Sequence, residues 1–307
     1  MKRWWVRPAV RMGAALMLPA LVPAIISALI WALPGDPASL ICPPKLCKGG
    51  AELAARWNLD AGPWNFFKGW MADAIALDFG RSWTAFQGMD VGTLLAESIP
   101  VTVMLVGLSS IWTFSGVMGA ATGWISARLD PLIQTSGTVP VLVLALVGAA
   151  VVDLTYGFGS TGKEGQLARL LIGSVVLGLA DGAFAGAVTG TRGLFRRESK
   201  QRYVGVAILR GEGELSNTLP NVMPALAGQV RARLLHLLSG AVVVEVMLKI
   251  DGIGDLLWIG TLEQDFGLVL ATATLFALAS AVLLMAQAVC EVLVALHVRR
   301  APSVGAA

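Results

Sequence analysis

Long apolar runs without a charged residue alternate with shorter polar segments along the chain. About 20 consecutive apolar residues cross the hydrocarbon core of a bilayer as a helix, so each run of that length predicts a membrane span. One of these runs is interrupted by Asp181 alone, and another carries Arg231, Arg233 and His236 near its middle. The pattern predicts an all-α integral membrane protein with about six transmembrane helices, at residues 12–35, 98–127, 131–152, 170–191, 215–244 and 266–290.

The composition of the chain agrees with a membrane protein and excludes several other classes. Hydrophobic residues make up 56% of the 307 residues and charged residues 14%, whereas a soluble domain has about 25% charged residues. A water-soluble enzyme of this composition would expose large apolar patches and aggregate. The chain is too hydrophobic for a disordered protein, and its net charge of +3 is too small to indicate a nucleic-acid partner. The lipid bilayer is therefore the first expected partner.

Lysine and arginine residues are distributed unequally between the two sides that the spans define. With the N-terminus inside, the inner segments hold 13 of them and the outer segments 7, although the outer segments contain more residues. Cytoplasmic loops carry the excess of Lys and Arg, so both termini are predicted to be cytoplasmic. The chain then divides into a tail with the first helix (1–35), an external loop (36–97) and a core with five further helices (98–307).

Residue types that carry catalysis or bind metals are sparse. The two histidines are far apart in the sequence, so neither a catalytic set nor a metal site is predicted. Cys42 and Cys47 lie in the predicted external loop, where an oxidising compartment favours a disulfide over free thiols. GFGSTGKE at residues 157–164 nearly matches a phosphate-binding loop, but Glu164 replaces the hydroxyl that holds Mg²⁺. No cofactor is therefore expected on this chain.

Two features inside the predicted spans are candidates for helix packing and for a polar path. Glycines at four-residue intervals form one slowly winding stripe that would let helices approach closely, within this chain or against a second one. Asp181 and Arg231 each lie about 15 Å from the inner surface at 1.5 Å per residue, so an ion pair of Asp181 with Arg231 or Arg233 is expected. Such a pair either lets the fifth span insert or lines a substrate path, and both interpretations stay open. The four glycines of the helix-packing stripe are Gly178, Gly182, Gly186 and Gly190.

Short motifs that follow one another along the chain resemble the permease subunits of ABC importers in the dipeptide, oligopeptide and nickel class. They run from the end of the first predicted span to the segment before the last one, so the resemblance covers most of the chain. In order, the motifs are PGDPA (34–38), ARWNLD (55–60), DFGRSW (78–83), IPVT (99–102), Thr191-Arg192 followed by Tyr203-Val204, Ala207 and Gly211, then LPNVMP (219–224), LLSGAVVVE (237–245) and DGIGDLL (251–257).

The resemblance assigns residues 192–224 to the cytoplasmic coupling loop of that family, in which a short helix seats in a groove of a separate ATPase. Ala207 would supply the tight contact with the ATPase, and Gly211 would let the chain turn without a Cβ penalty. Pro220 and Pro224 would restart a helix, because proline fits a first turn. The positions that match the family are Arg192, Tyr203, Ala207, Gly211, Pro220, Asn221 and Pro224.

The same resemblance implies the type I-like fold of an ABC importer permease in the bacterial inner membrane. It implies as partners a second homologous permease subunit, two cytoplasmic ATPase subunits that hold ATP and Mg²⁺, and an external solute-binding protein. The expected function is to form half of the translocation pathway of an ATP-driven importer, without enzyme activity in this chain. The expected cargo is a di- or oligopeptide.

Other functions remain open from the sequence alone. Nickel or another small solute could be the cargo, because family members carry different cargo. A stand-alone channel or secondary transporter would explain the charged spans but not the spacing in the coupling loop. A degenerate subunit that only assembles with partners would explain why fewer residues than is usual in the family separate Gly211 from Asn221.

Overall fold

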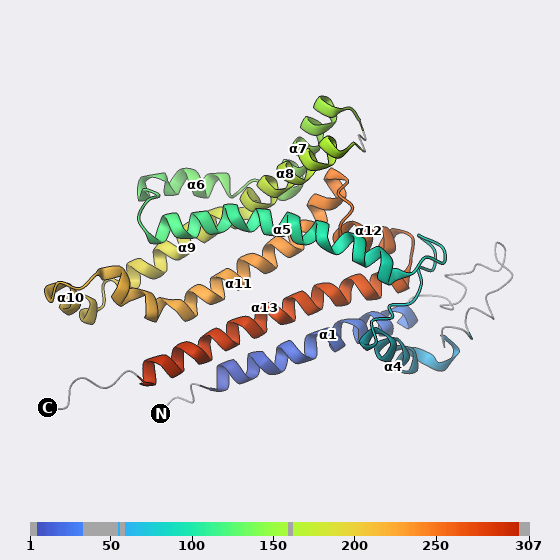
Figure 1. Cartoon of the computed structure of the whole chain (residues 1–307), viewed down its shortest axis with the longest axis horizontal. Coiled ribbons are helices and arrows are strands. Elements are labelled where there is room, and N and C mark those ends of the chain that lie inside the picture. The colour runs from blue at the N-terminus through green and yellow to red at the C-terminus, as the bar shows by residue number, and fades with distance from the viewer. Residues whose placement is uncertain (1–4, 33–54, 56–58, 159–161, 301–307) are drawn as a thin grey trace. The chain divides into compact units, whose positions relative to one another are not determined.

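The computed structural model describes residues 5–32, 55, 59–158 and 162–300, with side chains as far as residue 296. The described residues confirm the expected all-helical class, because besides helices they contain only an isolated bridge between Arg81 and Asp90 (Figure 1). The helices are α1 (Val6–Ala32), η1 (Leu59–Ala61), α4 (Gly62–Ile75), α5 (Val91–Ala121), η2 (Ala127–Leu129), α6 (Asp130–Ser136), α7 (Val141–Tyr156), α8 (Lys163–Leu179), η3 (Ala180–Gly182), α9 (Ala183–Glu198), α10 (Arg202–Leu209), α11 (Glu214–Leu248), α12 (Ile253–Leu262) and α13 (Phe266–Arg300).

Four helical stretches of the described chain are long and apolar enough to cross a membrane, and the bent pair α6–α7 makes five if it counts as one span. The four are Val6–Ala32, Val91–Ala121, Lys163–Glu198 and Phe266–Leu296. Helix α11 has 35 residues, which is long enough to cross, but its arginines lower its hydropathy. The chain is therefore a multi-pass membrane protein, and the count of six spans stays a prediction.

The prediction of one helix over residues 131–152 is wrong. The chain forms α6 and α7 there, which are bent by 79° at the break between them. Pro140 stands at the start of α7, and a proline inside a continuous helix would remove a backbone hydrogen bond and clash with the preceding turn. The apolar run is long enough for one helix, but its proline divides it.

The fourth predicted span is also interrupted, at the three-residue turn η3 between α8 and α9. Asp181 and Gly182 have left-handed backbone conformations there, with φ of 48° and 71°. The backbone N–H of Asp181 donates to the carbonyl of Val139 at 3.2 Å. The Asp181 carboxylate accepts the N–H of Val141 at 2.9 Å. The break between α8 and α9 is therefore held against the break between α6 and α7.

The chain forms two compact units, and the long helices contribute residues to both. The first unit comprises residues 1–15, 105–244 and 282–307, and in it α7 pairs with α8 while α6 pairs with α9 (Figure 1). The α7–α8 pair is joined by an ion pair of 2.6 Å between Asp153 and Arg169, whose side chain is only 3% exposed.

The second unit comprises residues 16–104 and 245–281. Its interior is apolar and partly aromatic, since Phe66 is 5% exposed and is flanked by Trp31 and Trp83 at ring-centroid distances of 5.4 and 6.2 Å. Burial of such large apolar side chains is the main stabilising contribution. The buried apolar residues of this unit include Ile30, Leu59, Val91, Leu94, Leu95, Leu256, Leu268, Leu270 and Ala271.

The expected segment boundaries at residues 35 and 97 stay predictions, as does the orientation of the termini. Cys42 and Cys47 lie outside the described residues, so their expected disulfide is untested. Residues 159–161 of the near match to a phosphate-binding loop lie outside them as well.

The predicted orientation can be tested by the labelling of single cysteines. In a variant whose three native cysteines are replaced by serine, Gln201→Cys, at an exposed position before α10, is expected to react only from the cytoplasmic side. Gln166→Cys, exposed in the first turn of α8, is expected to react only from outside. The measurement compares a membrane-impermeant maleimide on intact cells with inverted vesicles. Labelling of both positions from the same side would contradict the predicted orientation of these two segments.

Candidate functional site

The short helix α10 lies between the ends of α9 and α11, in the part of the chain assigned to the coupling loop (Figure 1). Its C-terminus closes on Gly211, whose φ of 82° is left-handed. The N–H of Gly211 donates to the carbonyl of Ile208 at 2.9 Å, and the N–H of Glu212 donates to that of Ala207 at 3.0 Å. This pair of bonds is the Schellman motif, which favours glycine because no Cβ is strained. The structure thus gives Gly211 the turning role that the resemblance implied.

Helix α10 has an inner and an outer face. Val204 and Ala207, three residues apart, are 0% and 5% exposed within this chain. Val206 and Leu209 are on the other face, and Leu209 is 88% exposed. Ala207 therefore seats α10 on its own chain, and the expectation that it touches an ATPase directly is corrected: the exposed apolar residues of α10 are the ones available to a partner.

Tyr203 joins the three helices of the coupling loop. Its hydroxyl donates to the carboxylate of Glu198 at the end of α9, at 2.6 Å, and accepts from the side-chain amide of Asn221 on α11, at 2.8 Å. Burial, together with the hydrogen bond to Glu198, raises the pKa of Tyr203 above its usual value of 10.0. The phenol therefore remains a hydrogen-bond donor at physiological pH, and Tyr203 and Asn221, both singled out from the sequence, are in contact.

Arg192 lies on α9 and reaches back to the first residue of α6 and to the turn before it. It forms an ion pair with Asp130 and donates to the carbonyl of Ile125 at 2.6 Å. Together with Phe195, it lines an open cavity of about 640 Å³ that also borders the start of α11. Arg192 thus acts within the fold, as an anchor between α9 and the turn before α6.

The expectation that Pro220 and Pro224 begin a helix is wrong, because α11 already begins at Glu214 and contains both prolines. The helix starts early because Gly211 ends α10 and Gly213 is the last residue before α11. Each proline removes one backbone donor from the interior of α11. Asn221 stands between them and faces Tyr203.

The glycine stripe makes close contacts inside this chain, although the break at Gly182 interrupts it. A Cβ at Gly178 would lie 3.0 Å from the carbonyl oxygen of Ser109, and one at Gly186 would lie 2.7 Å from the guanidinium of Arg233. At Gly190 it would lie 2.7 Å from the side-chain amide of Gln229. The glycines therefore let α8 approach α5 and let α9 approach α11.

The expected ion pair between Asp181 and the arginines of α11 is not formed in the described part of the chain. The left-handed turn directs the Asp181 carboxylate to the first turn of α7. Arg233 lies against Gly186 and contacts the carbonyl of Gly182 at 3.4 Å. Arg231 donates to Gln287 at 3.1 Å, and Gln287 donates in turn to Glu291. Arg231 thus belongs to a polar network with α13, and Arg233 contacts the backbone of η3.

Sequence reasoning missed a buried carboxylate in the second unit. Glu245 is 0% exposed, and it accepts hydrogen bonds from the hydroxyl of Thr102 at 2.7 Å and from the N–H groups of Gly254 at 2.7 Å and Asp255 at 3.2 Å. A Cβ at Gly252 would lie only 2.3 Å from its carboxyl carbon. Three of the motifs quoted above therefore meet at this carboxylate. IPVT ends at Thr102, LLSGAVVVE ends at Glu245 itself, and DGIGDLL contains Gly252, Gly254 and Asp255.

A second buried carboxylate organises the turn before α5. Asp265 accepts the hydroxyl of Ser82 and the N–H groups of Trp83 at 2.7 Å, Thr84 at 3.0 Å and Ala85 at 3.2 Å. Asp265 is 0% exposed. The DFGRSW motif thus ends at this carboxylate. The sequence did offer a signal for these buried acids, since Glu245 and Asp265 both border apolar runs. The segments that donate hydrogen bonds to them lie far away in the sequence, and a single sequence does not show which distant segments come into contact.

The match to a known family covers residues 112–300, more than half of the chain, and the family is described as a binding-protein-dependent transport system inner membrane component. The chain belongs to this family. It is therefore the membrane component of a bacterial ABC transporter, a multi-pass inner-membrane permease and not an enzyme. Such a component works with an ATPase and a solute-binding protein.

Individual relatives agree with this assignment. The glutathione transport system permease protein GsiC of Shigella boydii serotype 4 (strain Sb227) is 26% identical over 272 residues, covering 84% of this chain and 87% of that protein. The protein of the same name from Escherichia coli (strain K12) shows the same identity and coverage. The likeness thus extends well beyond the coupling loop.

Proposed function

We propose that this chain forms half of the translocation pathway of an ATP-driven importer, with a second, homologous permease as the other half. Two cytoplasmic ATPase subunits would dock on the coupling loop, and an external solute-binding protein would deliver the cargo. The family assignment supports the class of machine, and the geometry of α10 supports the way in which it is driven.

The single observation that carries the coupling proposal is the outer face of α10. Leu209 is 88% exposed, and Val206 and Ile208 are 47% and 48% exposed. Exposure of such an apolar patch to water is unfavourable, and binding in a groove of a partner would bury it. On its other side, α10 is fixed by Val204, Ala207 and the Tyr203 bridge. A push on its outer face is therefore transmitted to α9 and α11.

For the cargo we propose a small peptide such as glutathione. The supporting evidence is the name of the relatives, glutathione transport system permease, together with the resemblance to the peptide-carrying class. We also propose that this chain binds no cofactor, and that ATP and Mg²⁺ are held by the partner ATPases.

ATP-dependent uptake tests this function. The chain is co-reconstituted in proteoliposomes with a second permease, ATPase subunits and a solute-binding protein of the same family of importers, and labelled glutathione is supplied outside. Uptake that requires ATP, and that exceeds uptake of Ni²⁺ at equal concentration, is expected. ATP-dependent uptake of Ni²⁺ but not of glutathione or dipeptides would overturn the cargo. Uptake without ATPase subunits would overturn the importer.

A further inference from the structure

Helix α4 exposes an apolar face that the proposed function does not use. Trp64, Phe67, Met71 and Ile75 follow one another at intervals of three and four residues, which places them along one side of the helix. Trp64 is 60% exposed and Ile75 is 77% exposed, and Phe67 and Met71 are partly exposed. We call these four residues the outer stripe. An apolar stripe of this kind on a helix usually faces an apolar environment.

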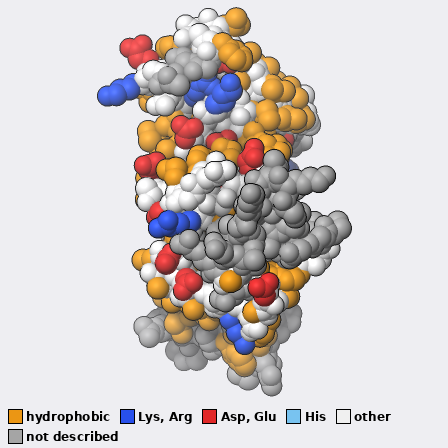
Figure 2. All heavy atoms as spheres, turned by 90° about the vertical axis from the view of Figure 1, so that its right-hand side faces the viewer, with side chains coloured by type: hydrophobic (Ala, Val, Ile, Leu, Met, Phe, Trp, Pro, Cys, Tyr) orange, Lys and Arg blue, Asp and Glu red, His pale blue; other side chains and the backbone are white. Residues whose placement is uncertain are grey.

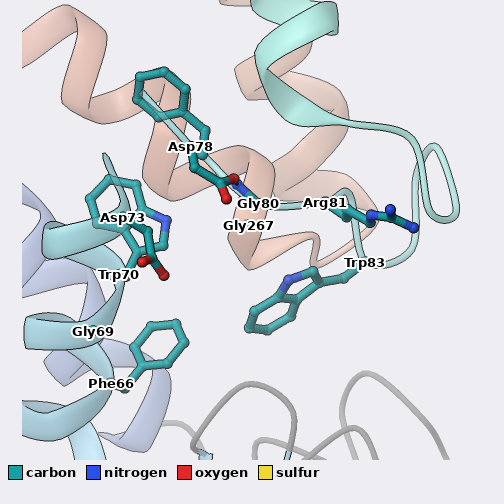
Figure 3. A pocket seen from close by; sticks show the side chains of 10 residues that line it. Phe66, Gly69, Trp70, Asp73, Asp78, Gly80, Arg81, Trp83 and Gly267 are labelled. Carbon is teal, nitrogen blue, oxygen red and sulfur yellow. The ribbon is translucent and has the colours of Figure 1, made fainter. Parts of the chain in front are cut away.

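The opposite side of α4 is buried within this chain. Phe66 is 5% exposed and belongs to one apolar cluster with Ile30 of α1 and Leu270 of α13. Its ring lies 5.4 Å from that of Trp31 and 6.2 Å from that of Trp83, measured between centroids. Figure 3 shows the side chain of Phe66 leaving α4 toward Trp83. Helix α4 is therefore apolar on two opposite sides, and the described residues cover only one of them.

The contacts of Phe66 fix the level of α4 relative to a membrane. Ile30 and Trp31 lie in the last turn of α1, and Leu270 lies in the second turn of α13; both helices are long and apolar enough to cross a bilayer. With 27 residues, α1 is about 40 Å long at 1.5 Å per residue, which is the thickness of a bilayer with its headgroups. The last turn of α1 therefore lies in the headgroup region, and α4 is packed on that turn.

The side chains of the outer stripe suit the headgroup region. The rings of Trp64 and Phe67 are stacked at a centroid distance of 5.5 Å, and the ammonium group of Lys68 lies 5.0 Å from the centre of the Trp64 ring. Tryptophan is enriched where a membrane meets water. A lysine at that level keeps its aliphatic stem on the apolar surface and extends its ammonium group to the lipid phosphates.

The two charges of α4 are distributed as a phosphate-bearing surface requires. Lys68 stands beside the outer stripe, whereas Asp73, the only acid of α4, lines a recess together with Phe66 on the other side (Figure 3). Figure 2 shows carboxylate side chains at several places on the face that it presents, but the outer stripe contains none. Lipid phosphates attract Lys68 and would repel a carboxylate at the same place.

From this geometry we infer that the outer stripe binds the surface of the lipid bilayer at the C-terminal end of α1, on the side that the charge distribution predicts to be external. The four apolar side chains enter the boundary between headgroups and acyl chains, and Lys68 contacts the lipid phosphates. Helix α4 is thus an interfacial helix that holds the segment between α1 and α5 on the membrane. The inference goes beyond the proposed function and does not depend on it, because it requires only this chain and lipid.

Spin labels on α4 test this inference in the full chain. Single cysteines are introduced into a variant whose three native cysteines are replaced by serine, and each labelled protein is reconstituted in lipid nanodiscs. Power-saturation EPR compares collisions with O₂, which concentrates in lipid, and with a water-soluble nickel chelate. Labels at Met71→Cys and Ile75→Cys are expected to prefer O₂ several-fold more than labels at Asn65→Cys and Ala72→Cys. The last two are matched controls at exposed positions of the same helix outside the outer stripe.

The two collision reagents distinguish what covers the outer stripe. A preference for the nickel chelate at Met71→Cys and Ile75→Cys would show that the stripe faces water. Low accessibility to both reagents would show that protein covers it, for example a second copy of the chain. Either result would overturn the inference.

Variants of Lys68 test the contact with lipid phosphates. Lys68 is exposed, so its replacement leaves the packing of α4 unchanged. Lys68→Glu is expected to lower the O₂ preference of the label at Ile75→Cys several-fold, because the lipid phosphates repel the new carboxylate. Lys68→Arg keeps the positive charge and should retain the O₂ preference. An unchanged preference in Lys68→Glu would overturn the phosphate contact.

Discussion

Leu209→Glu and Val206→Glu are expected to leave the permease in the membrane but to weaken its binding of the ATPase subunits. Both side chains lie on the exposed face of α10, and Leu209 is 88% exposed, so neither change disturbs the packing of this chain. In a docked complex each would place an unpaired charge in an apolar contact, where loss of a central residue costs about 2 kcal/mol or more. This corresponds to about 30-fold weaker association. The measurement is ATPase retained on the purified complex, together with substrate-stimulated ATP hydrolysis in vesicles.

Two further variants show whether the effect is specific to the outer face. Gln201→Glu adds the same charge at an exposed position just before α10, and it should retain wild-type association. Gly211→Val places a β-branched residue at a φ of 82° and strains the Schellman turn, so it should reduce association while membrane abundance stays unchanged. If Leu209→Glu and Val206→Glu bind and stimulate the ATPases like the wild type, α10 is not the docking element.

Gly252→Ala is expected to destabilise the protein severely, although it adds a single methyl group. The new Cβ would lie 2.3–2.5 Å from the Glu245 carboxyl atoms. That carboxylate is not free to move, because Thr102, Gly254 and Asp255 all donate to it in a fully buried site. Displacing it leaves buried donors unpaired at about 1–3 kcal/mol each. We expect a loss of about 3 kcal/mol, which for a chain of 307 residues is a fall of about 5 °C in the melting midpoint.

A double-mutant cycle separates this clash from a general sensitivity of the site. Glu245→Ala alone should also destabilise, since it removes the acceptor of the same donors. The pair Gly252→Ala with Glu245→Ala should lose much less than the sum of the single losses, because the clash is then absent. Gly107→Ala, at a helical glycine with open space around its Cβ, is the control and should be neutral or slightly stabilising. Additive losses in the pair would show that Gly252 is needed for another reason.

The sequence by itself determined the helical class, the position of most long helices and the family. Apolar runs of about 20 residues are a strong local signal, because every backbone polar group in a bilayer has to be satisfied within a helix. The turn at the end of α10 was also readable, since the left-handed conformation of Gly211 depends on a residue type at one position. These features are local in the chain, and one sequence is enough to show them.

Only the tertiary structure decided how the charged and small residues are used. Asp181 reads as a partner for the arginines of α11 but caps α7, because two adjacent left-handed residues turn it away from them. Ala207 reads as a docking residue but is buried against its own chain. Glu245 meets Thr102 across 143 positions of sequence, and Asp265 meets Ser82 across 183. Such contacts depend on how helices pack after they form, and hydrophobic periodicity does not encode them.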